Sequence, residues 1–172
     1  GFVGLYEMSP VSWGVFYLQD VAGFDPTTTT ATFLSVFYAF FTLSRMFLGG
    51  IMEKFGYVKS LTGCLLTSVF LHAIAFVFGG NAVWLIAVSG LSMGLLWPSM
   101  MALCVRIYGV NSGVASGVMM TICPLVTSVC QLLIGQVNTN FGIGIGYMFM
   151  SVFALLGILS LAVLKSNMKK EN

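Results

Sequence analysis

The stretch GGIMEKFGYVK, residues 49–59, gathers Glu53, Lys54 and Lys59 at the point where one long apolar run ends and the next begins. Charges are scarce on either side of it, because charged residues make up only 7% of the 172 residues and hydrophobic residues make up 58%. Soluble globular chains carry about 25% charged residues. Since so few charges cannot cover a surface that faces water, the sequence predicts an integral membrane protein.

Apolar runs long enough to cross a bilayer recur along the whole chain. A membrane-spanning helix needs about 20 mostly apolar residues. The predicted helices cover residues 2–18, 32–52, 61–78, 83–105, 114–137 and 145–164. Short connectors rich in Gly, Asn and Pro separate them, and these include residues 23–26, 79–81, 108–111 and 138–140. We therefore expect an all-α membrane protein with six transmembrane helices in one domain, residues 1–172.

The basic residues indicate which helix ends face the cytoplasm. They all lie at or beyond alternate helix ends: Arg45, Lys54, Lys59, Arg106, Lys165, Lys169 and Lys170. The first connector carries Asp20 and Asp25 instead. Because cytoplasmic loops are enriched in Lys and Arg, we expect both termini to be cytoplasmic in a multi-pass protein of the plasma (inner) membrane, surrounded by the lipid bilayer. A net charge of +2 gives no reason to expect a nucleic-acid partner.

Three predicted helices contain a proline well inside the apolar run: Pro10, Pro98 and Pro124. A proline removes a helical hydrogen bond and bends the helix. In a membrane such breaks persist where neighbouring groups or a cavity satisfy the freed carbonyls, as in transporters whose helices are broken. We therefore expect helix kinks at all three prolines. Small-residue pairs four residues apart also predict close helix approach, at Gly90 with Gly94 and at Gly113 with Gly117.

The spacing within residues 49–59 carries further information. It runs glycine, three residues, an acid and a base, one residue, glycine, two residues and a base. This spacing resembles the signature loop of the major facilitator superfamily, which joins the second and third helices of each six-helix half, although Ser60 stands where the family has a second basic residue. The resemblance assigns this loop to Arg45, Gly49, Glu53, Lys54, Gly56 and Lys59.

The physical chemistry of the loop agrees with this role. Gly49 and Gly56 permit a tight turn, and Glu53 is expected to accept hydrogen bonds from helix N-terminal amides or from Arg45. The resemblance implies that the chain is the C-terminal half of a twelve-helix transporter whose N-terminal six-helix half is missing. The start at Gly1 rather than at a methionine agrees with such a fragment.

A narrower resemblance lies in the first two predicted helices. Residues 4–7, Gly-Leu-Tyr-Glu, with Trp13 six residues further on, are similar to the seventh helix of the fucose and glucose/galactose permease group. Residues 33–50 are also similar to that group, and residues 90–98 resemble a later helix of the family. The resemblance implies proton-coupled transport of a sugar or another small polar organic solute by alternating access. It also implies that the first and fourth helices line the cavity and that the third and sixth face lipid.

Glu7 is the most informative charge, because it lies inside the first apolar run. An acid within a membrane is costly and is usually functional. We expect Glu7 to bind a hydroxyl-rich small-molecule substrate or to carry a proton. Polar and aromatic residues of the same and neighbouring helices complete the expected substrate and proton site: Ser12, Trp13, Tyr17, Trp97 and Gln131. For Gln131, a hydrogen bond between helices is the commoner role.

The single histidine, His72, lies inside the third predicted helix, where a structural hydrogen bond is a commoner role than a proton relay. The cysteines all lie in apolar runs without a C-x-x-C pair: Cys64, Cys104, Cys123 and Cys130. We expect them to be reduced packing residues. The sequence predicts no metal site and no cofactor.

Other functions fit parts of the sequence. The 11 methionines would suit an exporter of hydrophobic compounds within the same superfamily. A stand-alone six-helix membrane protein could complete a cavity by forming a homodimer. Residues 114–117, Val-Ala-Ser-Gly, loosely resemble an intramembrane serine protease, but that family has a glycine first and His72 precedes Ser116 here. We therefore do not expect an enzyme.

Overall fold

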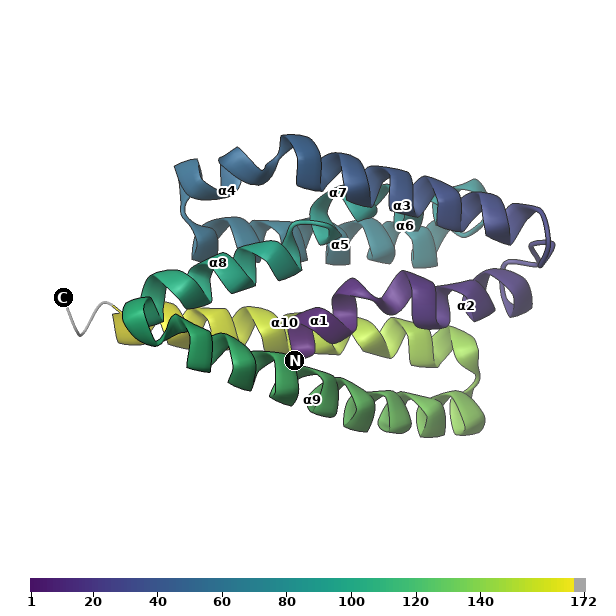
Figure 1. Ribbon diagram of the computed structural model, residues 1–172. Coiled ribbons are helices and arrows are strands. Elements are labelled where there is room, and N and C mark those ends of the chain that lie inside the picture. The colour runs from purple at the N-terminus through teal and green to yellow at the C-terminus, as the bar shows by residue number, and fades with distance from the viewer. Residues whose placement is uncertain (169–172) are drawn as a thin grey trace.

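The computed structural model describes residues 1–168, and this part of the chain is helical with no strand. The helices run back and forth beside one another and form an elongated bundle (Figure 1). Helical segments long and apolar enough to cross a membrane are Thr29–Phe47, Tyr57–Phe78, Gly80–Phe141 and Ile143–Asn167. The prediction of an all-helical protein is therefore confirmed, and the apolar helices agree with a membrane protein.

The predicted helices 2–18 and 83–105 are each interrupted. The first consists of α1 (Phe2–Glu7), the π-helical turn η1 (Pro10–Gly14) and α2 (Val15–Asp20). The other begins with the 3-10 turn η2 (Gly80–Val83) and continues as α6 (Trp84–Val88), α7 (Gly90–Met93) and α8 (Leu96–Tyr108). The remaining elements are α3 (Thr29–Phe47), α4 (Gly49–Phe55), α5 (Tyr57–Phe78), η3 (Gly109–Asn111), α9 (Ser112–Phe141) and α10 (Ile143–Met168).

In two places the chain stays helical beyond the predicted end of a helix, at residue 52 and at residue 137. Residues 49–55 form α4, and the chain reverses only at Gly56, whose φ of +88° favours glycine. Residues 138–140 belong to α9, and the chain turns at Gly142, with φ +85°. The polar side chains near this end do not stop the helix, because Thr139 and Asn140 donate to backbone carbonyls four residues earlier, at 2.9 and 2.8 Å.

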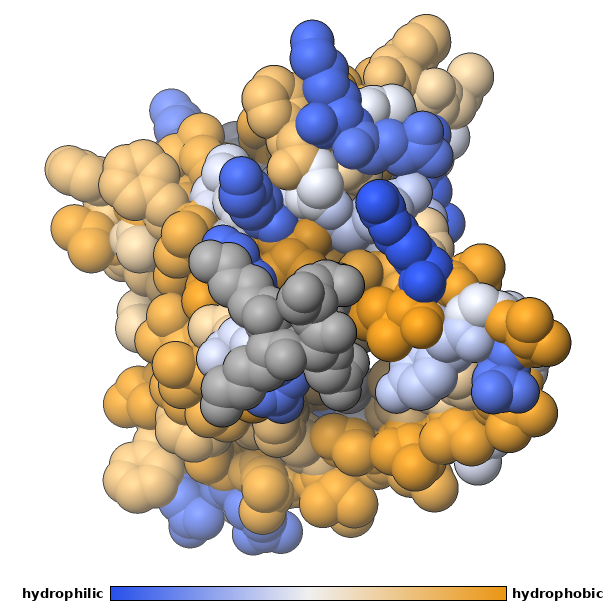
Figure 2. Space-filling view, turned by 90° about the vertical axis from the view of Figure 1, so that its left-hand side faces the viewer, coloured by the Kyte–Doolittle hydropathy of each residue, from blue (hydrophilic) through white to orange (hydrophobic). Residues whose placement is uncertain are grey.

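Charged residues gather at one end of the bundle. The α4–α5 turn, the α8–α9 turn and the C-terminal end of α10 all lie at that end (Figure 1). These elements carry Glu53, Lys54, Lys59, Arg106 and Lys165. Figure 2 faces this end and shows hydrophilic residues among hydrophobic ones that continue to the edges of the molecule. Lys169 and Lys170, also assigned to this end by the sequence, lie outside the described residues.

Asp25, in the connector before α3, fixes the start of that helix. Its carboxylate accepts hydrogen bonds from the backbone N–H of Thr27 and of Thr28, and from the hydroxyls of both residues, at 2.6–3.1 Å. These bonds, with the Thr28 hydroxyl as the largest cause, lower the pKa of Asp25 from 3.8 to about 2. The hydrogen bonds of this carboxylate therefore contribute fully above pH 3.8 and are lost as the pH falls through about 2.

Helix α7 packs closely against α3. A side chain at Gly90 would begin 2.5 Å from the Phe37 carbonyl oxygen, and one at Gly94 would collide with the Phe41 carbonyl and the Ser44 hydroxyl. Small residues allow two helix backbones to approach this closely. At Gly113 and Gly117, by contrast, a side chain would meet no atom of the described residues within 4 Å. The first pair therefore serves packing within the bundle.

Replacing Gly94 by alanine is expected to destabilise the protein by about 1–3 kcal/mol, because the added methyl group has no space against the backbone of α3. The matched control is Gly117→Ala, which places the same methyl group in open space in α9. The measurement is the thermal unfolding midpoint of the purified protein in detergent. Equal losses in the two variants would contradict the close contact between α7 and α3.

Candidate functional site

A buried acid meets an arginine where three segments of the chain come together. Arg45 of α3 donates from Nη2 to the Glu7 carboxylate of α1 at 3.4 Å, and from Nε to the Gly94 carbonyl at 2.9 Å. The Glu7 side chain is 3% exposed and also faces the backbone N–H of Trp97, whereas the Arg45 side chain is 43% exposed. We call Glu7, Arg45, Gly94 and Trp97 the acid–arginine cluster.

The position of Arg45 differs from the expectation that it pairs with Glu53 in the loop of residues 49–59. Arg45 lies eleven residues before Gly56, which is about 16 Å along a helix. At that depth its guanidinium packs on the Phe41 ring, 4.3 Å from the centroid, and reaches Glu7. Glu53 instead accepts a hydrogen bond from the Tyr57 hydroxyl at 3.3 Å. The expected Arg45–Glu53 pair is therefore wrong, because a short helix, α4, separates the two residues along the chain.

A second polar group joins η1 to α9. The Trp13 indole N–H donates to the Gln131 side-chain oxygen, and the Gln131 amide nitrogen lies 3.5 Å from the Ser12 hydroxyl. Ser12 also donates to the Met8 carbonyl at 2.9 Å. All three side chains of this group are partly exposed. We call Ser12, Trp13 and Gln131 the η1–α9 cluster.

The remaining residues of the expected substrate set lie apart from one another. The Trp97 ring packs over Gly4, where a side chain would begin 3.7 Å from the indole, so Trp97 lies beside α1 in the acid–arginine cluster. Tyr17 is 4% exposed and packs against Phe76 and Tyr147, with ring centroids 5.4 and 5.3 Å away. The structure thus brings together two groups of the expected site residues and places Tyr17 among buried aromatic rings.

The expected helix kinks lie in different surroundings. Pro10 is the first residue of η1, so the α-helical pattern is interrupted beside it. Pro98 is the third residue of α8, just after the turn at Gly94 and Leu95 that separates α7 from α8. Pro124 lies inside α9, which continues as one helix past it.

The structure shows a buried polar cluster that the sequence did not assign as a site. His72 is 1% exposed and lies between two tyrosine hydroxyls: that of Tyr6 is 2.5 Å from Nδ1, and that of Tyr147 is 3.4 Å from Nε2. The expected structural hydrogen bond of His72 is thus present. The signal in the sequence was a lone histidine in an apolar helix, but the tyrosines lie 66 and 75 residues away along the chain. The four cysteines are all free thiols.

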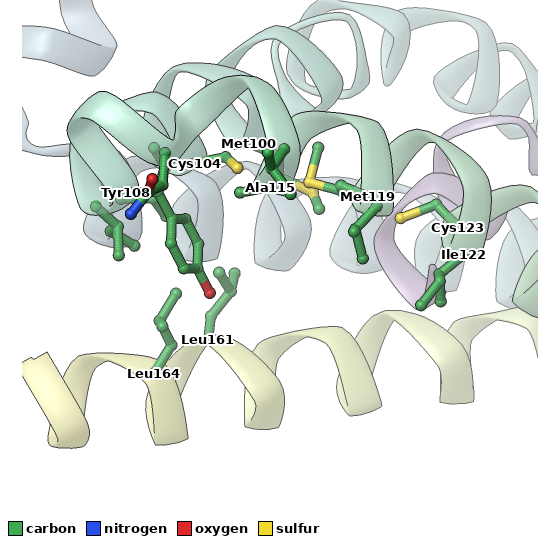
Figure 3. A pocket seen from close by; sticks show the side chains of 14 residues that line it. Met100, Cys104, Tyr108, Ala115, Met119, Ile122, Cys123, Leu161 and Leu164 are labelled. Atoms are coloured by element: carbon green, nitrogen blue, oxygen red, sulfur yellow. The ribbon is translucent and has the colours of Figure 1, made fainter.

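An apolar cavity of about 670 Å³ opens between α8, α9 and α10 (Figure 3). Figure 3 shows Met100, Met119 and Leu161 pointing into it from these three helices, with Tyr108 at one end. Pockets of about 300–1,000 Å³ hold small organic molecules. Among the described residues, no group of three or more His, Cys, Asp or Glu side chains could hold a metal ion.

The comparison with protein families gives the class of the protein. The family model of the Major Facilitator Superfamily matches residues 2–172, so the chain belongs to this superfamily of membrane transporters. No curated protein and no solved structure gives a significant match to the chain. The superfamily indicated by residues 49–59 is therefore confirmed, and with it the membrane location and the transporter class. Proton-coupled transport of a sugar, which the resemblance to sugar permeases implies, stays a prediction.

Removing Arg45 tests the acid–arginine cluster. Arg45→Ala is expected to destabilise the protein by about 1–3 kcal/mol, because it leaves the buried Glu7 carboxylate and the Gly94 carbonyl without their partner. In the Arg45→Ala background, Glu7→Gln should restore part of this loss, since it removes the unpaired charge. The measurement is a double-mutant cycle of thermal unfolding midpoints. Strictly additive losses would contradict the pairing.

Proposed function

We propose that the chain is the C-terminal half of a secondary active transporter that works by alternating access, and that it moves a sugar or another small polar organic solute together with protons. The observation that carries the proposal is the acid–arginine cluster, in which a fully buried acid meets a half-exposed arginine at two helix interruptions. Interrupted helices with charged groups at their ends form the binding sites of many transporters.

Each part of the cluster has a role in this proposal. Glu7 takes up the proton, and Arg45 pairs with the carboxylate when the proton leaves. Because the Arg45 side chain is 43% exposed, the pair can be reached from the side of the bundle that carries the arginine. The η1–α9 cluster supplies hydroxyl, amide and indole groups for a hydroxyl-rich solute. Tyr17, being buried, contributes to the site only by packing.

The proposed setting is a multi-pass protein of the plasma (inner) membrane with six transmembrane helices and both termini in the cytoplasm. The gathering of Lys54, Lys59, Arg106 and Lys165 at one end of the bundle supports this orientation. Signature-loop residues Gly49, Glu53, Lys54, Gly56 and Lys59 would then lie at the cytoplasmic surface. The N-terminal six-helix half would face the half-exposed side of the acid–arginine and η1–α9 clusters.

Glu7→Gln is expected to abolish uptake driven by a pH gradient while expression stays normal, because glutamine keeps the shape but cannot carry a proton. The measurement is uptake of labelled sugars into membrane vesicles with and without a pH gradient. The matched control is Asp20→Asn, which removes an exposed acid at the end of α2. Unchanged uptake in Glu7→Gln would exclude Glu7 as the proton carrier.

The cavity between α8, α9 and α10 favours a second candidate function, the export of hydrophobic compounds within the same superfamily. Its lining is almost entirely aliphatic, aromatic and sulfur-containing, with Asn111 as an exception. Such a lining would suit a lipophilic cargo better than a sugar. The same vesicles separate the two candidates, because the exporter would move lipophilic cations and leave sugars untouched.

The mass of the natural polypeptide tests whether the chain is one half of a larger protein. An antibody to residues 165–172 should detect a membrane protein of about twice the 18.5 kDa of this chain or somewhat more, because a transport path lies between two six-helix halves. The measurement is a blot of native membranes. A band near 18.5 kDa would instead support a stand-alone six-helix protein that dimerises.

A further inference from the structure

The side chains of the first interrupted helix point in directions that an uninterrupted α-helix would not allow. Tyr6 and Trp13 are seven residues apart, which is about two turns, so they would lie on the same face. In the structure Tyr6 is 1% exposed and contacts His72 of α5, whereas Trp13 is partly exposed and bonds to Gln131 of α9. Gly14, not Trp13, lies against Tyr147 of α10.

The π-helical turn η1 accounts for this change of direction. A π-turn holds an extra residue, and one residue corresponds to a rotation of about 100° in an α-helix. After η1 the helix again turns a side chain to its buried face. Tyr17 of α2 packs on Tyr147, which also contacts His72, the partner of Tyr6. The wide turn therefore swings Trp13 outward toward α9 and brings Gly14 inward in its place. Turns of this kind occur frequently at functional sites.

The inward position of Gly14 depends on Tyr147. A side chain at Gly14 would begin 3.0 Å from the Tyr147 hydroxyl oxygen, so this space has no room for an indole. Tyr147 in turn lies 3.4 Å from Nε2 of His72, and Nδ1 of His72 lies 2.5 Å from the Tyr6 hydroxyl. One chain of polar contacts thus connects α1 to the residue that faces η1. We call Tyr6, His72 and Tyr147 the tyrosine–histidine clamp.

We propose that the tyrosine–histidine clamp positions Ser12 and Trp13 of η1 against Gln131, so that its three members are positioning residues for the proposed solute site. The clamp excludes the register in which Trp13 faces α10, because Tyr147 fills that space. The clamp also connects Tyr6 of α1, which precedes η1, to Tyr147, which packs on Gly14 of η1. Only the statement that the η1–α9 cluster binds the solute rests on the proposed function.

The polar character of the clamp explains why it specifies one register rather than merely filling space. A neutral imidazole has one donor and one acceptor, and each tyrosine hydroxyl can take either role. All three side chains are at most 2% exposed, so a shift in register would leave buried polar groups without partners. Apolar rings of similar size would pack equally well in neighbouring registers and would carry no such penalty.

The test observes Trp13 directly. The natural protein is labelled with fluorotryptophan, and the Trp13 resonance is assigned by its loss in Trp13→Phe. We expect His72→Phe to shift or broaden this resonance, because both tyrosine hydroxyls lose their contact with the imidazole. His72→Gln, which can still donate and accept, should restore part of the original signal. Tyr147→Phe removes a single hydroxyl and gives a milder shift, so it serves if His72→Phe does not fold.

Ser68→Ala is the matched control. It removes another buried hydrogen bond of α5, the 2.6 Å contact with Ser92 one turn from His72, and changes no side chain of the clamp and no backbone group. The Trp13 resonance should stay in place in this variant. An unmoved resonance in both His72→Phe and Tyr147→Phe would overturn the proposal, and so would an equal shift in Ser68→Ala.

Transport measurements separate the clamp from the proposed function. If Ser12 and Trp13 contact the solute, His72→Phe raises KM several-fold, while His72→Gln stays closer to the unchanged protein. A shifted Trp13 resonance with unchanged transport would support the clamp and would show that the η1–α9 cluster is not the solute site. An unshifted resonance with altered transport would overturn the clamp and leave the proposed function standing.

Discussion

The guanidinium of Arg45 is the contact on which the middle of the bundle depends. It satisfies the Gly94 carbonyl at the interruption between α7 and α8, pairs with Glu7 just before the interruption at η1, and packs on the Phe41 ring of its own helix. The Glu7 carboxylate is buried, so it must find its partner within the protein. One cation therefore satisfies a backbone carbonyl at one helix interruption and a buried carboxylate beside the other.

This arrangement explains why α7 must pack so closely on α3. The Gly94 carbonyl comes within hydrogen-bond distance of Nε only because Gly90 and Gly94 have no side chains to hold the helices apart. From α3 the Arg45 side chain then extends past Gly94 to the Glu7 carboxylate of α1. The close packing of α7 on α3 and the pairing of the buried Glu7 therefore depend on each other.

The sequence predicted the helical class, the superfamily and most turns, because apolar runs, glycines and the spacing of residues 49–59 are local signals. It missed the end of α9, where Asn138 and Asn140 suggest a turn but Gly142 makes it. It identified Glu7, Ser12, Trp13 and Gln131 as polar residues in apolar helices. It could not pair Arg45 with Glu7 or His72 with its tyrosines, since these contacts join residues 38, 66 and 75 positions apart.

The first interrupted helix places polar groups of different character on its different sides. Toward α3 and α8 it presents the acid Glu7, whose partner is half exposed, and toward α9 it presents neutral donors and acceptors that are also partly exposed. Toward α5 and α10 it presents neutral groups that are buried, and among them Tyr6 is paired with His72 in the clamp. An exposed polar group can exchange its partner for water or a solute at little cost, whereas a buried one cannot. The sides that face α3 and α9 are therefore suited to binding, and the side that faces α5 and α10 is suited to holding the helix in place.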